Sequence, residues 1–158
     1  MHHKRNLGFT LIELVIVLVL LGILVITTLP RVDFRIFSDN AFERELSSAL
    51  QYARREAMNT GCPVKVVIKP DIDRFDVKYV DDDCPTNGVL PHPLSNGDYW
   101  AQSSSGNVIK SVSEPEIVFT HIGSLDADSS IEIEFQNGRK LILQGGTGYI
   151  QLSKDESS

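Results

Sequence analysis

Glu13 is the residue of this 158-residue chain that most needs a chemical explanation, because no other charged residue lies within the apolar segment 9–29. A carboxylate in a membrane helix costs about 2.5–3.5 kcal/mol at the bilayer centre on insertion scales, and less near the interface. Such a residue suggests a cationic partner. The other candidates for chemistry, Cys62 and Cys84, lie well beyond this segment.

The apolar segment 9–29 has the length and the flanking charges of a membrane helix. Its 21 residues would span about 31 Å as a helix, which is enough to cross a bilayer core. Lys4 and Arg5 precede it and would hold that side in the cytoplasm, so the rest of the chain would face outward. An ordinary signal peptide has a shorter apolar region and a small-residue cleavage site, which this segment lacks.

Residues 8–13, G-F-T-L-I-E, resemble the type III signal of type IV prepilins and type II secretion pseudopilins. In that family a prepilin peptidase cuts after the glycine and methylates the new N-terminus. The resemblance implies cleavage between Gly8 and Phe9, N-methylation of Phe9, and a helix bend at Pro30. It also implies that Glu13 neutralises the Phe9 amine of a neighbouring subunit. A signal anchor that never assembles is the alternative, and it leaves Glu13 unexplained.

The resemblance divides the chain into four parts. They are a cleaved leader (1–8), a transmembrane and assembly helix (9–29), a periplasmic continuation of that helix (30–60) and a β-rich globular head (61–158). The subunit would sit in the inner membrane with its head in the periplasm, and would then enter a pilus or pseudopilus filament.

The segment 41–58 reads as an amphipathic helix. Its apolar residues recur at steps of three and four and form one stripe: Phe42, Leu46, Ala49, Leu50, Ala53 and Ala57. Asn40 and Glu43 have the spacing of a capping box, which allows a separate second helix. The family resemblance favours one long helix bent at Pro30.

Cys62 and Cys84 flank two β-rich runs, 64–69 and 75–80, almost symmetrically. Pairing these runs as a hairpin brings the cysteines together, and an outward-facing domain favours their oxidation. We therefore predict a disulfide that contributes roughly 3 kcal/mol in the chain-entropy model. A metal site is not predicted, because two cysteines alone lack the remaining ligands.

The rest of the head predicts strands at 117–120, 131–135, 140–143 and 149–152, with 81–115 mostly loop and Trp100 packed in the core. In the last hairpin we predict a three-residue loop with Gly138 left-handed. That prediction pairs Phe135 with Leu141 and Ile133 with Leu143, which keeps the apolar side chains on one face. The predicted fold class is α+β and pilin-like, with a long N-terminal helix packed against antiparallel sheet.

The head also resembles GspH/FimT-type minor pilins and pseudopilins, through residues 49–57, G-C-P-V at 61–64, and V-F-T at 118–120 with Gly123. This resemblance implies a minor type IV pilin, a structural subunit that takes part in initiating and assembling a pilus with other pilin subunits. Leu29-Pro30-Arg31 and the two cysteines resemble those of minor pilins of the mannose-sensitive haemagglutinin type. The alternatives are a minor pseudopilin of a type II secretion system and a pilus-tip adhesin or DNA-binding minor pilin.

Nucleic-acid binding, catalysis and cofactors are not expected. Removing Lys4 and Arg5 with the leader leaves 13 basic and 21 acidic residues, a net charge of −8, and the segment 145–150 has no arginine. No nucleophile elbow, phosphate loop or zinc-protease motif is present. Two acidic clusters lack the spacing of a calcium-binding loop and are predicted to be solvated: Asp71, Asp73 and Asp76, and residues 81–83.

Overall fold

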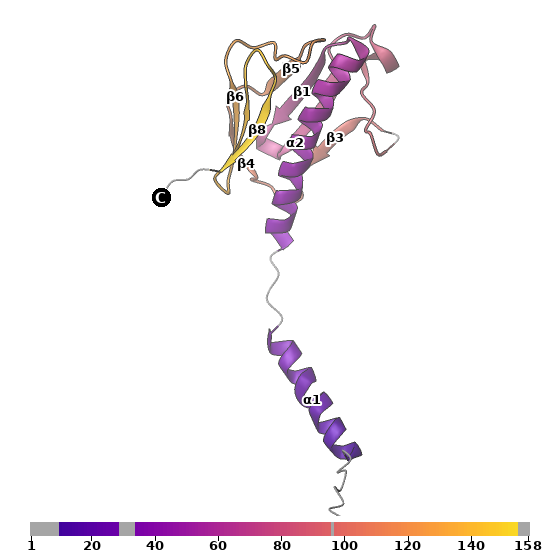
Figure 1. Ribbon diagram of the computed structural model, residues 1–158, viewed down its shortest axis with the longest axis vertical. Helices are drawn as coiled ribbons and strands as arrows, with labels where there is room; N and C mark the ends of the chain where they lie inside the picture. Colours follow the sequence, from indigo (N-terminus) through magenta and orange to yellow (C-terminus); the bar gives the residue numbers. More distant parts are fainter. Residues whose placement is uncertain (1–9, 29–33, 96, 155–158) are drawn as a thin grey trace, which may run out of the picture. The chain divides into compact units, whose positions relative to one another are not determined.

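The computed structural model describes residues 10–28, 34–95 and 97–154, which belong to two compact units divided after Phe34. The first unit holds helix α1 (Leu11–Thr28). The second holds nearly all of helix α2 (Phe34–Thr60) and the eight strands found in the described ranges (Figure 1). The predicted α+β class, with a helix packed against antiparallel sheets, is confirmed.

Helix α1 begins directly after Thr10. The backbone N–H groups of Glu13 and Leu14 donate to the Thr10 carbonyl at 3.1 and 3.2 Å, and the Glu13 N–H also lies 3.4 Å from Thr10 Oγ1. Thr10 and Glu13 thus have the spacing of a capping box. Within the ranges that the structure describes, no helix meets the length and apolarity needed to span a membrane. Gly8, Phe9 and Pro30 lie outside the described residues.

Helix α2 runs unbroken from Phe34 to Thr60, so the suggestion that a helix begins at Asn40 is wrong. Asn40 instead lies inside the helix, where its Oδ1 accepts a hydrogen bond from Arg139 Nη1 at 3.1 Å. The predicted apolar stripe is confirmed, because every member is at most 5% exposed. The helix ends where Gly61 adopts a positive φ of 72° and donates its N–H to the Ala57 carbonyl.

Two four-stranded antiparallel sheets make up the rest of the head. The first has the order β3 (Tyr99–Gln102), β2 (Arg74–Tyr79), β1 (Val64–Lys69) and β5 (Glu116–Phe119). The second has the order β4 (Ile109–Val112), β6 (Ile131–Phe135), β7 (Arg139–Leu143) and β8 (Ile150–Lys154). Short 3-10 turns lie at Pro70–Ile72 (η1) and Pro85–Gly88 (η2).

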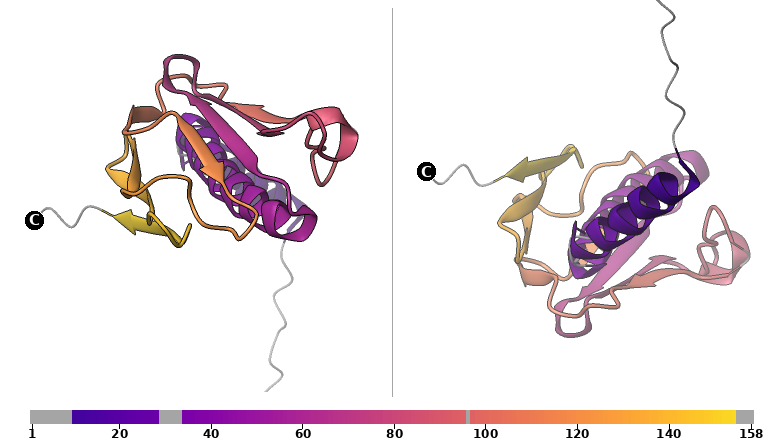
Figure 2. Two further views of the ribbon diagram at one scale, coloured as in Figure 1. Left: turned by 90° about the horizontal axis from the view of Figure 1, so that it is seen from above. Right: turned by 90° about the horizontal axis from the view of Figure 1, so that it is seen from below.

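The hydrophobic core lies between α2 and the inner faces of both sheets, which border the helix in the end-on views of Figure 2. On the helix, Leu46 and Leu50 are fully buried, and the Phe42 ring lies 5.8 Å from that of Phe75 on β2. Strands contribute alternate residues, as one-sided burial of a sheet requires. The sheets therefore depend on α2 for their cover.

The predicted register of the β6–β7 hairpin is wrong by two residues. Ile133 pairs with Leu141, and Ile131 pairs with Leu143. The three-residue loop is as predicted, with Gly138 at a positive φ of 76° and its N–H bonded to the Phe135 carbonyl. Because side chains alternate with a period of two, an offset of two leaves the apolar residues on the inner face.

The stretch 81–115 carries two strands, β3 and β4. The prediction that Trp100, which lies on β3, packs in the core is wrong. Trp100 is 49% exposed, whereas its neighbour Tyr99 is buried. Alternation along β3 turns Tyr99 toward α2 and Trp100 toward solvent. There the Arg74 guanidinium lies 4.6 Å from the centroid of the Trp100 ring.

Candidate assembly site

Glu13 lies in the first turn of α1, where its side chain is exposed. A carboxylate at this end of a helix is favoured by the unpaired backbone N–H groups and the helix dipole. Its neighbours Leu11 and Leu14 are 80% and 59% exposed. The turn thus offers one anionic group within an apolar surface, which suits a cation that arrives in an apolar environment. The predicted partner, the Phe9 amine, lies outside the described residues.

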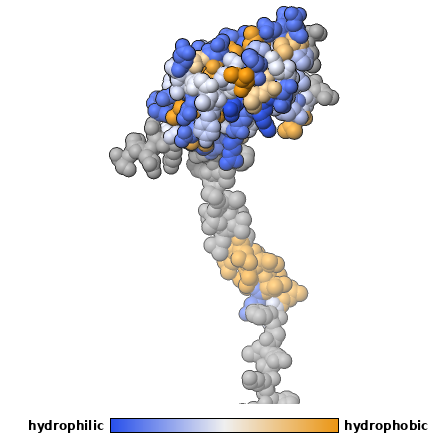
Figure 3. Space-filling model, turned by 45° about the horizontal axis from the view of Figure 1, so that its top comes forward, coloured by the Kyte–Doolittle hydropathy of each residue, from blue (hydrophilic) through white to orange (hydrophobic). Residues whose placement is uncertain are grey.

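The surface of the described part of α1 is almost wholly apolar, whereas that of the head is mainly hydrophilic (Figure 3). Every large apolar side chain from Leu11 to Leu21 is exposed, including Leu18 at 60% and Leu21 at 52%. Apolar surface of this extent marks a contact with membrane or protein.

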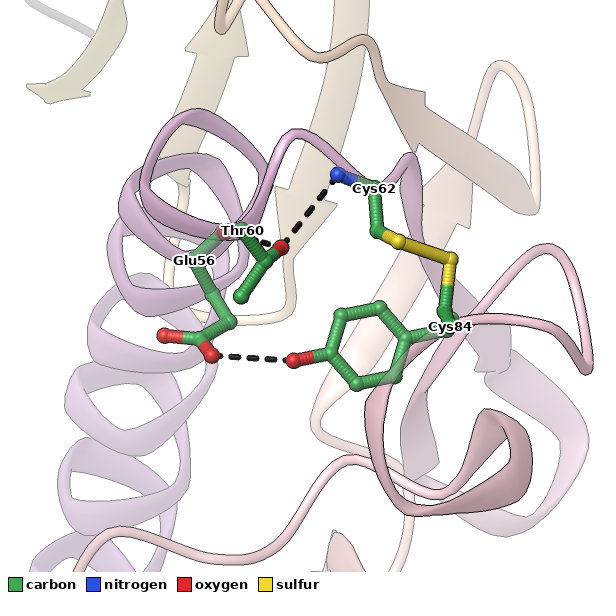
Figure 4. The surroundings of a disulfide bond; sticks show 5 residues. Glu56, Thr60, Cys62 and Cys84 are labelled. Carbon is green, nitrogen blue, oxygen red and sulfur yellow. Dashed lines mark hydrogen bonds between the residues drawn. A yellow bond between two sulfur atoms is a disulfide. The ribbon is translucent and has the colours of Figure 1, made fainter.

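The C-terminal end of α2 is fixed to the first sheet by a disulfide and a polar cluster (Figure 4). Cys62, just after the helix, is bonded to Cys84 in the loop after β2, with their Cα atoms 6.0 Å apart. Thr60 Oγ1 donates to the Glu56 carbonyl at 2.7 Å and accepts the Cys62 N–H at 3.3 Å. The Tyr79 hydroxyl donates to Glu56 Oε1 at 2.9 Å, and burial together with Glu56 raises the pKa of Tyr79 to about 12.

A second tyrosine fixes the middle of α2. The Tyr99 hydroxyl donates to Glu45 Oε1 at 3.2 Å, and His92 Nε2 lies 3.6 Å from the same oxygen. The His92 and Tyr99 rings meet edge to face at 4.6 Å. Burial, followed by the Glu45 carboxylate, raises the pKa of Tyr99. These contacts join the 80–98 loop to the helix.

Glu43 joins the N-terminal half of α2 to the second sheet. It is only 2% exposed, its Oε1 accepts a hydrogen bond from Asn137 Nδ2, and its Oε2 lies 3.2 Å from Arg139 Nε. Burial raises the pKa of Glu43, and the Arg139 charge and the Asn137 hydrogen bond oppose that rise. The sequence had suggested only a capping role for Glu43. Its spacing of three and seven from Leu46 and Leu50 was the signal that it lies on the buried side.

Asp73 is a buried structural residue, so the prediction that it is a solvated turn acid is wrong. It is 1% exposed and takes a left-handed φ of 46°. Its two carboxylate oxygens accept the N–H groups of Val108 and Ile109 at 2.9 and 2.8 Å. Asp76, on the neighbouring strand, pairs with Lys69 and Arg74. The part of the chain that the structure describes holds no group of three or more metal-ligating side chains.

Two family models match the chain. The prokaryotic N-terminal methylation motif matches residues 3–29, which include Gly8, Phe9 and Glu13, and the type II transport protein GspH matches residues 44–153. The chain belongs to the GspH family. Membership makes it a structural subunit of the pilin and pseudopilin type rather than an enzyme.

Solved structures with a similar fold include proteins of two bacteria. The type IV minor pilin FimU of Pseudomonas aeruginosa superposes on this GspH-family chain with a TM-score of 0.53 at 19% identity, covering 72% of this chain and 87% of FimU. A second crystal form of FimU gives 0.51 at 20% identity, with 72% and 91% coverage. The minor pseudopilin EpsH of Vibrio cholerae gives 0.48 at 13% identity, with 77% and 97% coverage. No curated protein matches the sequence.

Proposed function

We propose that this GspH-family chain is a minor type IV pilin that helps to initiate and assemble a pilus filament. The observation that carries the proposal is the combination of an N-terminal methylation motif over residues 3–29 with a pilin-like head of the FimU fold. Such a subunit needs a segment that packs among other subunits and a head that folds by itself. The exposed apolar α1 and the internally buried α2 meet these two requirements.

In this proposal, prepilin peptidase cleaves between Gly8 and Phe9 and N-methylates Phe9. The subunit then crosses the inner membrane once, with its N-terminus cytoplasmic and its head periplasmic, and the helix bends at Pro30. On entry into the filament, Glu13 pairs with the Phe9 amine of a neighbouring subunit. Mass spectrometry of the membrane-bound protein should find an N-terminal methylated Phe9, and an intact Met1 would contradict this processing.

The second candidate is a minor pseudopilin of a type II secretion system, and the GspH match is the observation that favours it. Electron microscopy of a clean deletion strain, with the restored gene as control, separates the two. Loss of surface pili that returns on complementation supports the minor pilin. Intact pili with a loss of secreted enzymes supports the pseudopilin.

A further inference from the structure

The second sheet has an open edge at β8. This strand pairs with β7 on one side, and no described strand pairs with the other side. Gln144 donates its N–H to the Tyr149 carbonyl, which fixes the phase of the antiparallel ladder. Tyr149 and every second residue after it therefore direct their backbone N–H and C=O groups toward β7. The residues between them, Ile150, Leu152 and Lys154, direct these groups away from β7. These groups are free to pair with another extended chain.

The inner face of β8 is only partly covered by α2. Leu152 pairs with Leu141 and Ile150 pairs with Leu143, so both side chains lie on the side of the sheet that is buried elsewhere. Leu152 is nevertheless 49% exposed. The α2 residues beside Leu152 include Ser47 and Ser48, whose side chains are small and polar rather than apolar.

Two hollows of about 300 and 320 Å³ follow one another between α2 and β8. We call them together the α2–β8 groove. The first is lined by Ser47 and Ser48 of the helix and by Leu152 of the strand. The second is lined by Gln51, Tyr149 and Ile150.

The groove is basic at both ends, although the chain as a whole has a net charge of −6. Arg44 lines one end and Arg55 the other, and neither forms a hydrogen bond or ion pair with a residue in the described ranges. Its acidic lining residue, Glu43, is already paired with Arg139. A ligand that enters the groove therefore meets two arginine side chains that form no ion pair in the described ranges, although Arg44 lies close enough to Glu43 for their charges to interact.

We propose that the α2–β8 groove binds an extended segment of a neighbouring filament subunit, which adds to β8 as a fifth strand. The open backbone edge provides the hydrogen bonds, as in other cases of strand addition. The segment would place an apolar residue over Leu152 and Ser47, with an acidic residue two positions away on each side. The two acidic residues of the segment would be about 14 Å apart along a strand, which is close to the distance of about 16 Å between Arg44 and Arg55 along the helix.

The partner in this inference rests on the proposed function, but its test does not depend on pili. The probe is the synthetic peptide acetyl-TETVTET-amide, titrated into the isotope-labelled full chain in detergent micelles and followed by amide NMR. We expect shifts confined to the groove and slower hydrogen exchange of the N–H groups of Ile150, Leu152 and Lys154. The acetyl-TKTVTKT-amide peptide should bind at least tenfold more weakly.

Two variants and one control sharpen the test. The charge reversal Arg44→Glu with Arg55→Glu should weaken binding at least tenfold, and Leu152→Pro should abolish it by removing an outward N–H. Lys78→Glu, which reverses a single charge on an exposed residue of the first sheet outside the groove, should bind as the wild type does. Spectra of the unbound variants establish that the head is folded.

Three results would overturn the inference: no binding at millimolar peptide, equal binding of the lysine peptide, or displacement of the peptide by duplex DNA at lower concentration. The last result would mean that the groove recognises phosphate rather than an extended polypeptide. Peptide binding in the groove together with intact pili in the deletion strain would leave the groove assigned and contradict the minor-pilin function.

Discussion

The two helices of this chain differ in where their apolar side chains lie. Between Leu11 and Leu21 of α1 they are exposed, with Leu11 at 80% and Leu18 at 60%. Along α2 the members of the apolar stripe are at most 5% exposed, because two sheets cover them. The charged residues differ too: Glu13 is exposed on α1, whereas Glu43 on α2 is buried against Arg139.

This difference separates folding from assembly. The apolar surface of α2 is used within the chain, so substitutions there should change the stability of the head. The apolar surface of α1 is available to a membrane or to other subunits, so substitutions there should leave the stability of the head unchanged. Each prediction below tests one side of that division.

The largest effect is expected from Leu46→Ala in α2. Leu46 is fully buried, and removing a buried leucine side chain costs about 2–5 kcal/mol of the free energy of unfolding. Guanidinium unfolding of the full chain in micelles, followed by Trp100 fluorescence, measures it. Leu18→Ala is the matched control and should leave the midpoint unchanged. Equal losses from both substitutions would erase the division between the helices.

The disulfide should be next in size. Replacing both Cys62 and Cys84 by serine frees a loop with a sequence separation of 22 residues, at a cost of about 3 kcal/mol in the chain-entropy model. The same unfolding experiment measures this loss. A thiol assay on the denatured, unreduced wild type should find no free thiol, and two thiols would contradict the pairing.

Tyr79→Phe should lower the free energy of unfolding by about 1 kcal/mol at neutral pH, because it removes the hydrogen bond to Glu56. At alkaline pH the wild type should become the less stable of the two proteins. The pKa of Tyr79 is about 12 in the folded chain against 10 in the unfolded chain, so the folded state keeps a proton that the unfolded state loses. The wild type should therefore lose more stability than Tyr79→Phe between pH 10 and 12. Parallel pH profiles would contradict this account of the cluster.

The smallest effect is expected from Glu43→Gln. It is a change in the slope of the free energy of unfolding against pH. Burial raises the pKa of Glu43 above 4.5, so the folded state binds a proton more readily than the unfolded state. The contribution of this group to stability should therefore fall as pH rises above 4.5, and glutamine should remove that fall. Urea midpoints from pH 4 to 7 measure the slope. Glu132→Gln removes the same charge at an exposed site and separates burial from charge loss.

The sequence predicted those parts of the fold in which a local pattern carries the information. The stripe of α2 and the alternation in β6 and β7 follow from helical and strand periodicity, and both were confirmed. The hairpin register was wrong by two because either register keeps the apolar residues inside. Trp100 was misplaced because one tryptophan in a loop-like stretch has no period to show which way it faces.

The polar contacts that hold the head together had no such signal. Asn137 lies 94 residues from Glu43, and Val108 lies 35 residues from Asp73, so their meeting depends on the tertiary fold. The prediction for Asp73 was wrong because a carboxylate in a helix or turn ordinarily faces solvent. The N-terminal segment is the opposite case: a short local motif predicts processing and assembly, and those predictions concern other molecules.

The most direct test of the central claim is a count of surface pili in the deletion strain complemented with wild type, Glu13→Ala or Glu132→Ala. Quantitative immunoblots of membranes must show equal amounts of each protein. We expect wild type and Glu132→Ala to restore pili and Glu13→Ala to leave the strain bare, because in the proposed function the Glu13 carboxylate neutralises the Phe9 amine of a neighbouring subunit. Full restoration by Glu13→Ala would contradict the assignment of α1 to assembly.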